Sequence, residues 1–248
     1  MKHVLAHILR SKQRYAVLPL FVCLQDDSLP PLVRLDFMRG FAFFVMAFGD
    51  LNRYVLRREP AGDVFQACIN EHTREDDHHW PWFLDDLETL GWSGATTTTD
   101  ALRTLWREDT HRSRLLMYDL CAIIGGADSV ERMAVIEAIE ETGNVIFSHT
   151  ARLADAVRIA TGRHLRYMGP YHFALETGHL QGSEHADLAR IELSDAKRAR
   201  CVESVDRVFR TFEAWSHEAA ELIARAASRA PPFDTIAPPP GRYPQARP

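Results

Sequence analysis

Two short stretches of the sequence gather histidines and acids in a way that suits metal binding. Residues 71–83 read EHTREDDHHWPWF, with histidines at positions 72, 78 and 79 and acids at positions 71, 75, 76 and 77. Residues 171–185 read YHFALETGHLQGSEH, with three more histidines and two more acids. Imidazole and carboxylate groups bind metal ions, and they also act as general acids and bases. Which chemistry applies depends on whether these side chains point into a core or into water.

The first stretch continues an amphipathic helix that we expect over residues 62–80, with a kink or an end at Pro81. On a helical wheel of about 100° per residue, His72 and His79 fall near the centre of the apolar face, and Glu75 and Asp76 lie to either side. The apolar face is defined by Val64, Phe65, Cys68 and Ile69. Buried acids need cations, hydrogen bonds or a metal. These residues are therefore either core histidine–acid pairs or metal ligands.

In the second stretch, His172, Glu176 and His179 stand at positions i, i+4 and i+7. This spacing places all three side chains on one stripe of a helix. Mixed nitrogen and oxygen ligation of this kind suits iron or manganese. The stripe thus predicts that this helix supplies part of a metal site.

A third helix, expected to begin after Asp128 or Ser129 and to end near Gly162, offers one more inward acid. On its wheel Glu140 comes nearest the buried face, whereas Glu137 and Glu141 lie further out. Glu140 is therefore a candidate bridging carboxylate, or else a partly buried acid paired with an arginine. Carboxylates and histidines that project from facing helices into a bundle core are the basis of di-iron sites.

The composition fits one globular protein with a sizeable core. The chain has 248 residues, of which 46% are hydrophobic and 25% charged, and its formal net charge is −5. Its basic residues are scattered, which argues against nucleic acid as a partner. The four cysteines form no CxxC pair, and we see neither a signal peptide nor a membrane span. We therefore expect a cytoplasmic protein without disulfides.

Helical periodicity runs through almost the whole chain, and no segment shows strand alternation. We expect a single all-α domain of seven to eight helices over residues 1–229, followed by a disordered, proline-rich tail at residues 230–248. The longer helices are expected at 31–58, 62–80, 101–124, 130–160, 170–193 and 194–229.

The two histidine-rich stretches also carry a family resemblance. HTREDDHHWPWFLDDLETLG resembles a pattern of His-x2-Glu-acid-x2-His-x2-Trp followed by Asp-Leu and Leu-Gly, and HFALETGH resembles a His-x3-acid-x2-His closing motif. With VLPLFVCLQDDSLPPLVRLDFMRGF, they make the sequence similar to the haem-oxygenase-like, iron-containing redox enzymes. That family includes CADD-like proteins, non-haem oxidases of acyl substrates and N-oxygenases. The resemblance covers residues 19–229.

Carried over residue by residue, the resemblance identifies a set of ligands. The family's first histidine falls on His79, and its preceding acid falls on Glu75 or Asp76. The remaining family ligands fall on Glu140, His172, Glu176 and His179. This sequence departs from the family at His72, where some members have a glutamate, and at Glu176, where relatives often have an aspartate. Both departures leave open whether one metal or two are bound.

The resemblance implies a haem-oxygenase-like bundle that binds iron, two ions per chain, with manganese as the other candidate. It implies an oxidase or oxygenase that acts with O2 on a small organic, acyl or amino-acid-derived molecule, and it allows a homodimer. Trp80, Trp82, Phe83, Phe43 and Phe44 line an apolar pocket in this interpretation, or else pack in the core.

Two other interpretations remain open at this point. A metal-independent enzyme, similar to the TenA-type thiaminases or the cofactor-independent quinone-forming oxidases, would use the same His and Glu residues as acids and bases. A helical binding module without catalysis would use them as core pairs, with the proline-rich tail as a docking segment.

Overall fold

The structure, a computed structural model, describes residues 1–181 and 188–229, apart from the side chains of residues 178–181. Every regular element in this part of the chain is helical, so the protein is all-α. Residues 230–248, the expected tail, lie outside the described residues. Among the helices that the structure describes, none combines the length and apolar character needed to cross a membrane.

The first half of the chain forms short helices and the second half forms long ones. The first half contains α1 (Lys2–Tyr15), α2 (Pro19–Gln25), α3 (Pro31–Leu35), α4 (Phe37–Asp50), a π-helical turn (Leu51–Leu56), α5 (Val64–Asp76), α6 (Trp80–Thr89) and α7 (Thr98–Leu105). The second half contains α8 (His111–Gly125), α9 (Ser129–Thr161), α10 (Pro170–Gln181) and α12 (Asp195–Arg229).

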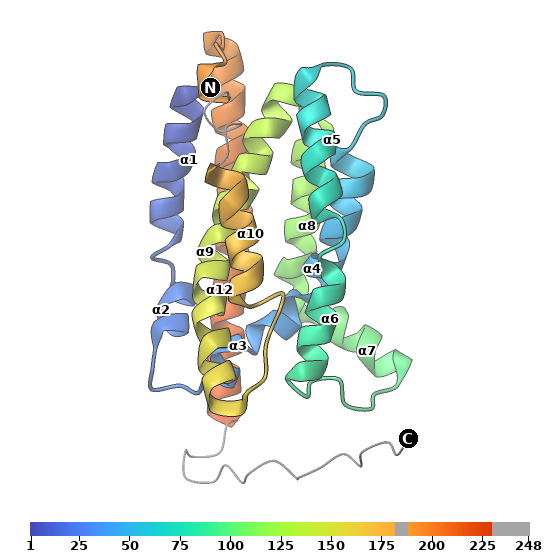
Figure 1. The fold of residues 1–248 in the computed structure, drawn as a ribbon, viewed down its shortest axis with the longest axis vertical. Coiled ribbons are helices and arrows are strands. Elements are labelled where there is room, and N and C mark those ends of the chain that lie inside the picture. The colour runs from blue at the N-terminus through green and yellow to red at the C-terminus, as the bar shows by residue number, and fades with distance from the viewer. Residues whose placement is uncertain (182–187, 230–248) are drawn as a thin grey trace.

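The helix α9 is the axis of the bundle. It contacts α1, α3, α5, α10 and α12, and most helices run along the long axis of the molecule (Figure 1). On one side of the bundle, α5 and α6 follow each other end to end, and α10 lies beside α9 (Figure 1). This arrangement brings the junction of α5 and α6 towards the middle of α9 and α10.

Local sequence signals fix both ends of α9. The side chain of Asp128 accepts a hydrogen bond from the backbone N–H of Glu131, and the side chain of Glu131 accepts one from the N–H of Asp128, which completes a capping box. The helix ends at Gly162, whose φ of 72° is left-handed and favours glycine. The predicted span of this helix therefore agrees with the observed one.

Two predicted helices are divided in the structure. The segment expected at 31–58 separates into α3, α4 and the π-helical turn Leu51–Leu56. The segment expected at 101–124 breaks after Leu105, where Arg107 is extended with a ψ of 153°. The guanidinium of Arg114 donates to the carbonyls of Leu105 and Arg107. These hydrogen bonds satisfy carbonyl groups that the break releases, so no proline or glycine is needed there.

A continuous apolar core fills the bundle. Its largest fully buried side chains include Trp215, Phe21, Phe37, Phe83 and Phe212. Polar side chains interrupt this core mainly where α5, α6, α9 and α10 meet, and those side chains form the site described next.

Candidate metal centre

The chain between α5 and α6 turns sharply at the histidine-rich stretch. Helix α5 ends at Asp76, the residues Asp77 and His78 form a turn, and His79 occupies the N-cap position of α6. Pro81 lies in the first turn of α6, where its missing N–H costs nothing. The predicted helix over residues 62–80 is therefore wrong at its last residues, and His79 does not lie on the wheel of α5.

Asp77 anchors this turn from outside the site. Its carboxylate lies 2.6 Å from Nη2 of Arg57 and 3.5 Å from Nε of Arg53. Burial opposes ionisation of Asp77, but the hydrogen bonds from these arginines outweigh it and lower the pKa of Asp77. Gly49 lets α4 approach the turn, because a Cβ atom there would lie 2.9 Å from the Asp77 carbonyl oxygen. Asp77 thus holds the backbone that presents His79.

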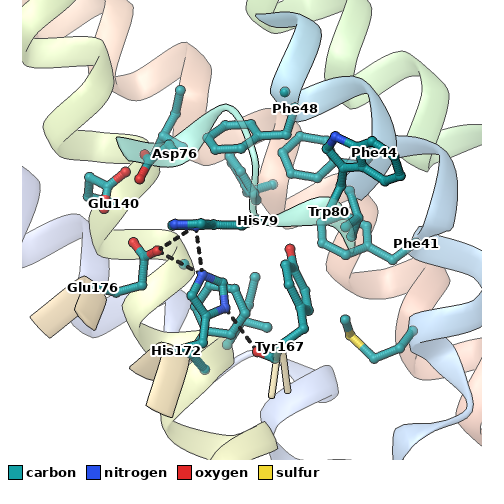
Figure 2. Close-up of a pocket in the computed structure, with 18 residues that line it drawn as sticks. Phe41, Phe44, Phe48, Asp76, His79, Trp80, Glu140, Tyr167, His172 and Glu176 are labelled. Atoms are coloured by element: carbon teal, nitrogen blue, oxygen red, sulfur yellow. Dashed lines mark hydrogen bonds and ion pairs between the residues drawn. The ribbon is translucent and has the colours of Figure 1, made fainter. Parts of the chain in front are cut away.

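His79, His172 and Glu176 form a first group of potential ligands, called here the His172 triad (Figure 2). Nε2 of His172 lies 2.9 Å from Oε1 of Glu176 and 3.2 Å from Nδ1 of His79. Nδ1 of His79 lies 3.7 Å from the same Glu176 oxygen. All three side chains are buried. Two of these residues come from successive turns of α10, as the i, i+4 spacing predicts.

The ring of His172 is held in one orientation and one tautomer. Its Nδ1 donates a hydrogen bond to the backbone carbonyl of Tyr167 at 2.9 Å. In the neutral ring, the lone pair is then on Nε2, the atom that faces Glu176 and His79. A histidine that donates one N–H to a carbonyl and offers its other nitrogen is the usual arrangement of a metal ligand.

His72, Asp76 and Glu140 form the second group, called here the His72 triad. Nε2 of His72 lies 3.1 Å from Oδ2 of Asp76 and 3.4 Å from Oε1 of Glu140. Asp76 and Glu140 are buried, whereas His72 is only partly so. Two of these residues come from α5, and Glu140 comes from the facing α9.

The carboxylates of the His72 triad are incompletely satisfied. Oδ2 of Asp76 lies against Nε2 of His72, but within residues 1–177 and 188–229 Oδ1 of Asp76 and Oε2 of Glu140 have no hydrogen-bond partner. Buried acceptors without partners are rare in proteins and cost free energy. A bound cation at this position would satisfy them, so the donor set fits a metal ion.

The two triads meet at their glutamates. Burial and then the charge of Glu176 raise the pKa of Glu140 well above its usual value. Burial also opposes ionisation of Glu176, but the hydrogen bond and charge of His172, with a hydrogen bond from Glu140, lower its pKa to about 2. Glu140 of the His72 triad thus faces Glu176 of the His172 triad (Figure 2), and it keeps its proton more readily than an ordinary glutamate does.

The histidines of the two triads also differ in charge. Burial lowers the pKa of His79 to about 4, so its ring is neutral at pH 7 and can offer a lone pair. Burial acts in the same direction on His72, but the hydrogen bonds and charges of Asp76 and Glu140 outweigh it and raise its pKa well above the usual value. His72 is thus a cation that a bound metal would have to replace.

A cavity adjoins the triads and is polar at one end only. It offers about 60 Å³ to the centre of a water-sized sphere, several times what one ordered water occupies. Asp76, His79, Glu140, His172 and Glu176 form its polar end. Phe41, Phe44 and Phe48 lie on the other side of the cavity (Figure 2), and Phe147, whose ring centroid is 4.3 Å from that of His172, and Phe212 complete the apolar lining. A small molecule bound here would meet the triads with an apolar wall behind it.

The aromatic residues expected at a pocket divide between three roles. Trp80 and Phe44 line the cavity. Phe83 is fully buried in the core, and Phe43 packs edge-on against Trp106 and Tyr118. Trp82 stacks on the ring of His79, with centroids 4.5 Å apart and an angle of 18°.

Of the eight sequence-predicted ligands, six lie together in the two triads. Those six are His72, Asp76, His79, Glu140, His172 and Glu176. Glu75 is exposed and belongs to neither triad, so the structure selects Asp76 as the acid that precedes His79. His179 belongs to α10, but its side chain lies outside the described residues.

Sequence reasoning overlooked Tyr167 as a cavity residue and Asp86 as a buried carboxylate. Tyr167 lines the cavity, and burial raises the pKa of its hydroxyl well above the usual range. Asp86 is 1% exposed on α6. In the sequence, Asp86 is the second aspartate of FLDDLETL, a segment that we used only for the family resemblance.

Comparisons with known proteins do not identify this chain. No protein-family model matches it, and no curated protein matches its sequence.

Proposed function

We propose that the two triads bind a pair of iron ions and that the protein is a non-haem iron oxidase or oxygenase. The observation that carries this proposal is the pair of three-ligand groups that meet at Glu140, with buried carboxylate oxygens of Asp76 and Glu140 left without partners in the described part of the chain. Six imidazole and carboxylate ligands from helices α5, α9 and α10 and the α5–α6 junction suit iron, with manganese as the other candidate.

Each residue has a distinct role in this proposal. His79, His172 and Glu176 would hold one ion, and His72 and Asp76 would hold the other, with Glu140 between them. Reduced iron held in this way supplies the electrons with which O2 is activated. The carbonyl of Tyr167 keeps the His172 ring aimed at the site, and the phenylalanines of the cavity exclude water from it.

The cavity favours an apolar reacting group in the substrate. Among the described lining residues, none is a lysine or arginine, and the polar groups beyond the two triads are those of Trp80 and Tyr167. A substrate would therefore place a hydrocarbon or aromatic portion against the phenylalanines, and any charged end would lie at the metals or outside the cavity.

The proposal is tested by anaerobic titration of the metal-free protein with ferrous iron, followed by exposure to O2 and measurement of oxygen uptake. We expect about two ferrous ions bound per chain and iron-dependent consumption of O2. The variant His172→Ala should lose one of the two ions. A folded protein that binds no iron, or that keeps both ions when His172 is replaced, contradicts the proposal.

A metal-independent acid–base enzyme is the second candidate. The observation that favours it is Glu140, a buried acid with a raised pKa that lines the cavity beside neutral His79. Under this alternative, chelation leaves activity unchanged, and Glu140→Gln abolishes it without affecting any bound metal. The ferrous titration therefore distinguishes the two candidates.

A further inference from the structure

The carboxylate of Asp86 holds a segment of backbone that lies far away in the sequence. Asp86 lies in α6, about two turns after His79. Its Oδ1 accepts the backbone N–H of Arg166 at 2.6 Å, and its Oδ2 accepts the backbone N–H of Met168 at 2.8 Å. The side chain is 1% exposed, and it forms no ion pair within the part of the chain that the structure describes. Its hydrogen bonds therefore position backbone and do not neutralise a charge.

The segment that Asp86 holds is the one that orients His172. Tyr167 lies between the two anchored residues, and its carbonyl accepts the hydrogen bond from Nδ1 of His172 at 2.9 Å. The segment closes tightly at Gly169, where a Cβ atom would lie 1.9 Å from the carbonyl oxygen of Leu165. The position of the Tyr167 carbonyl is thus fixed on one side by the Asp86 carboxylate and on the other by this turn.

The same segment also supports His79. The guanidinium of Arg166 lies over the ring of Trp82, 4.0 Å from its centroid, and Trp82 stacks on His79 at 4.5 Å. A cation over a tryptophan face is attractive. The segment therefore touches both imidazoles of the His172 triad, one through a carbonyl and the other through a stack of side chains.

We propose that Asp86 is a positioning residue of the His172 triad, which sets the orientation of the His172 ring and supports the ring of His79 for metal binding. The metal-binding part of this inference rests on the proposed function. Residues 166–168 meet His172 through the Tyr167 carbonyl and meet His79 through Arg166 and Trp82, and both histidines belong to the His172 triad. We therefore expect Asp86 to act mainly on the ion of that triad.

Burial and backbone hydrogen bonds act on this carboxylate in opposite directions. Burial raises the pKa of Asp86 to about 6. The backbone N–H groups of Met168, Arg166 and Tyr167 favour the ionised form, but they offset only part of this effect. Asparagine has nearly the same shape, but it replaces one acceptor by an NH2 group that would face a backbone N–H. The substitution Asp86→Asn thus removes one of the two anchors with little change in volume.

Glu218 provides a matched control far from the triads. It is a buried glutamate of α12 whose oxygens accept the backbone N–H of Arg112 at 3.1 and 3.0 Å, and burial raises its pKa as well. It too anchors the backbone of a sequence-distant segment, and it also pairs with His111 at 3.1 Å. Glu218→Gln should therefore cost at least as much stability as loss of one backbone anchor, without touching either triad.

The first measurement is the hydrogen bond from Nδ1 of His172 in the metal-free protein, read by NMR from the exchange rate of the Nδ1–H proton with water. We expect a protected Nδ1–H proton in the wild type and in Glu218→Gln, and a rapidly exchanging one in Asp86→Asn. An equally protected proton in Asp86→Asn overturns the proposal. Because this measurement needs no metal, it decides the positioning role even if the protein binds no iron.

The second measurement is titration with Co2+ as a spectroscopic substitute for iron. Loss of an outer hydrogen bond to a ligand typically costs 10–100-fold in metal affinity. We expect a loss of that size, about tenfold or more, for one of two Co2+ ions in Asp86→Asn, and for neither in Glu218→Gln. Equal weakening of both ions in Asp86→Asn contradicts a role confined to the His172 triad. If the wild type binds no Co2+, the proposed function fails, whereas the exchange rate of the His172 Nδ1–H proton still decides the positioning role.

A milder variant covers the case in which Asp86→Asn does not fold. Arg166 is exposed, so Arg166→Ala should fold. It removes the cation over Trp82 and keeps the backbone anchors, so we expect weaker binding of the same single ion and an unchanged exchange rate of the His172 Nδ1–H proton. Unchanged binding of both ions overturns the His79 branch of the proposal.

Discussion

The two triads hold the same kinds of ligand but differ in how far the protein alone completes them. In the His172 triad, Glu176 is paired with His172 at 2.9 Å, the His172 ring is locked by a carbonyl, and His79 is stacked on Trp82. In the His72 triad, His72 faces both carboxylates, but Oδ1 of Asp76 and Oε2 of Glu140 have no hydrogen-bond partner within the described residues. One triad is already organised without a metal ion, whereas the other holds two buried carboxylate oxygens that a metal ion would satisfy.

This difference assigns different tasks to the two groups. An organised triad gains little stability from an ion but sets its geometry. A triad with unsatisfied buried acceptors gains more, because the ion removes a cost that the folded protein otherwise bears. We therefore expect the His72 triad to contribute most of the stabilisation by metal and the His172 triad to contribute most of the geometric control.

The largest effect should come from breaking the organised triad. His172→Ala removes the partner of Glu176, which is buried, and leaves a carboxylate uncompensated. Loss of one partner of a buried pair typically costs about 3–5 kcal/mol, so we expect a decrease of that size in the unfolding free energy of the metal-free protein. Urea denaturation measures it. His164→Ala, which replaces an exposed histidine, is the control and should stay within about 0.5 kcal/mol of the wild type. Equal effects of the two variants would contradict the pairing.

The raised pKa of Asp86, which supports that triad, should make the stability of the protein depend on pH. The pKa of Asp86 is about 6 in the folded protein and 3.8 in a model peptide, so the folded state binds the proton more tightly. Its contribution to stability is therefore largest below pH 3.8 and is lost as pH rises through about 6.

The comparison that isolates Asp86 is wild type against Asp86→Asn, because asparagine does not titrate. The unfolding free energy of the wild type relative to this variant should fall between pH 4 and pH 7, by up to about 3 kcal/mol. Urea denaturation of both proteins across this range provides the values. A difference that is constant with pH would show that Asp86 titrates normally.

Replacing either of two neighbouring glutamates of α9 by glutamine should change the unfolding free energy in opposite directions. Glu141 is buried and pairs with Lys12 of α1 at 2.5 Å, so Glu141→Gln should destabilise the metal-free protein by about 1 kcal/mol or more. Glu140 instead faces Glu176, another acid, so Glu140→Gln should leave the metal-free protein as stable as the wild type or raise its stability by about 1 kcal/mol.

The same two substitutions should affect metal affinity differently from stability. Glu140→Gln is expected to weaken metal binding strongly, whereas Glu141→Gln should leave it unchanged. Thermal unfolding with and without Co2+ measures both quantities. A clear loss of stability in metal-free Glu140→Gln would identify its pair with His72 as a structural ion pair and not as a metal site.

The smallest effect is expected at Glu75, the acid that the structure leaves out of both triads. Glu75→Gln should change neither the number of bound Co2+ ions nor their affinities, and should change the unfolding free energy by no more than about 0.5 kcal/mol. Asp76→Asn serves as the matched contrast and should lose the ion of the His72 triad. The reverse pattern would assign the ligand to Glu75.

Patterns within a single helix were enough to predict much of the structure. The all-α class follows from helical periodicity, and the capping box at Asp128 and the glycine at 162 mark the ends of α9. The i, i+4 spacing of His172 and Glu176 brings both side chains together because α10 is continuous between them. These features depend only on residues close to one another in the sequence.

Features that depend on breaks or on distant partners could not be read in this way. The wheel of α5 left Glu75 and Asp76 as alternatives, and it included His79 although the helix ends at Asp76. His79 reaches the site because the turn at 77–78 redirects the chain. Asp86 was overlooked because its partners are backbone N–H groups 80 and 82 residues further along the chain, which carry no side-chain signal.

The order of the ligands along the chain has a consequence for assembly during translation. His72, Asp76 and Glu140 have all been synthesised once residue 140 is added, whereas the His172 triad needs residue 176. The ligands of the His72 triad therefore leave the ribosome before the last ligand of the His172 triad. If the proposed ions bind during synthesis, the direction of synthesis favours the His72 triad as the first to be filled.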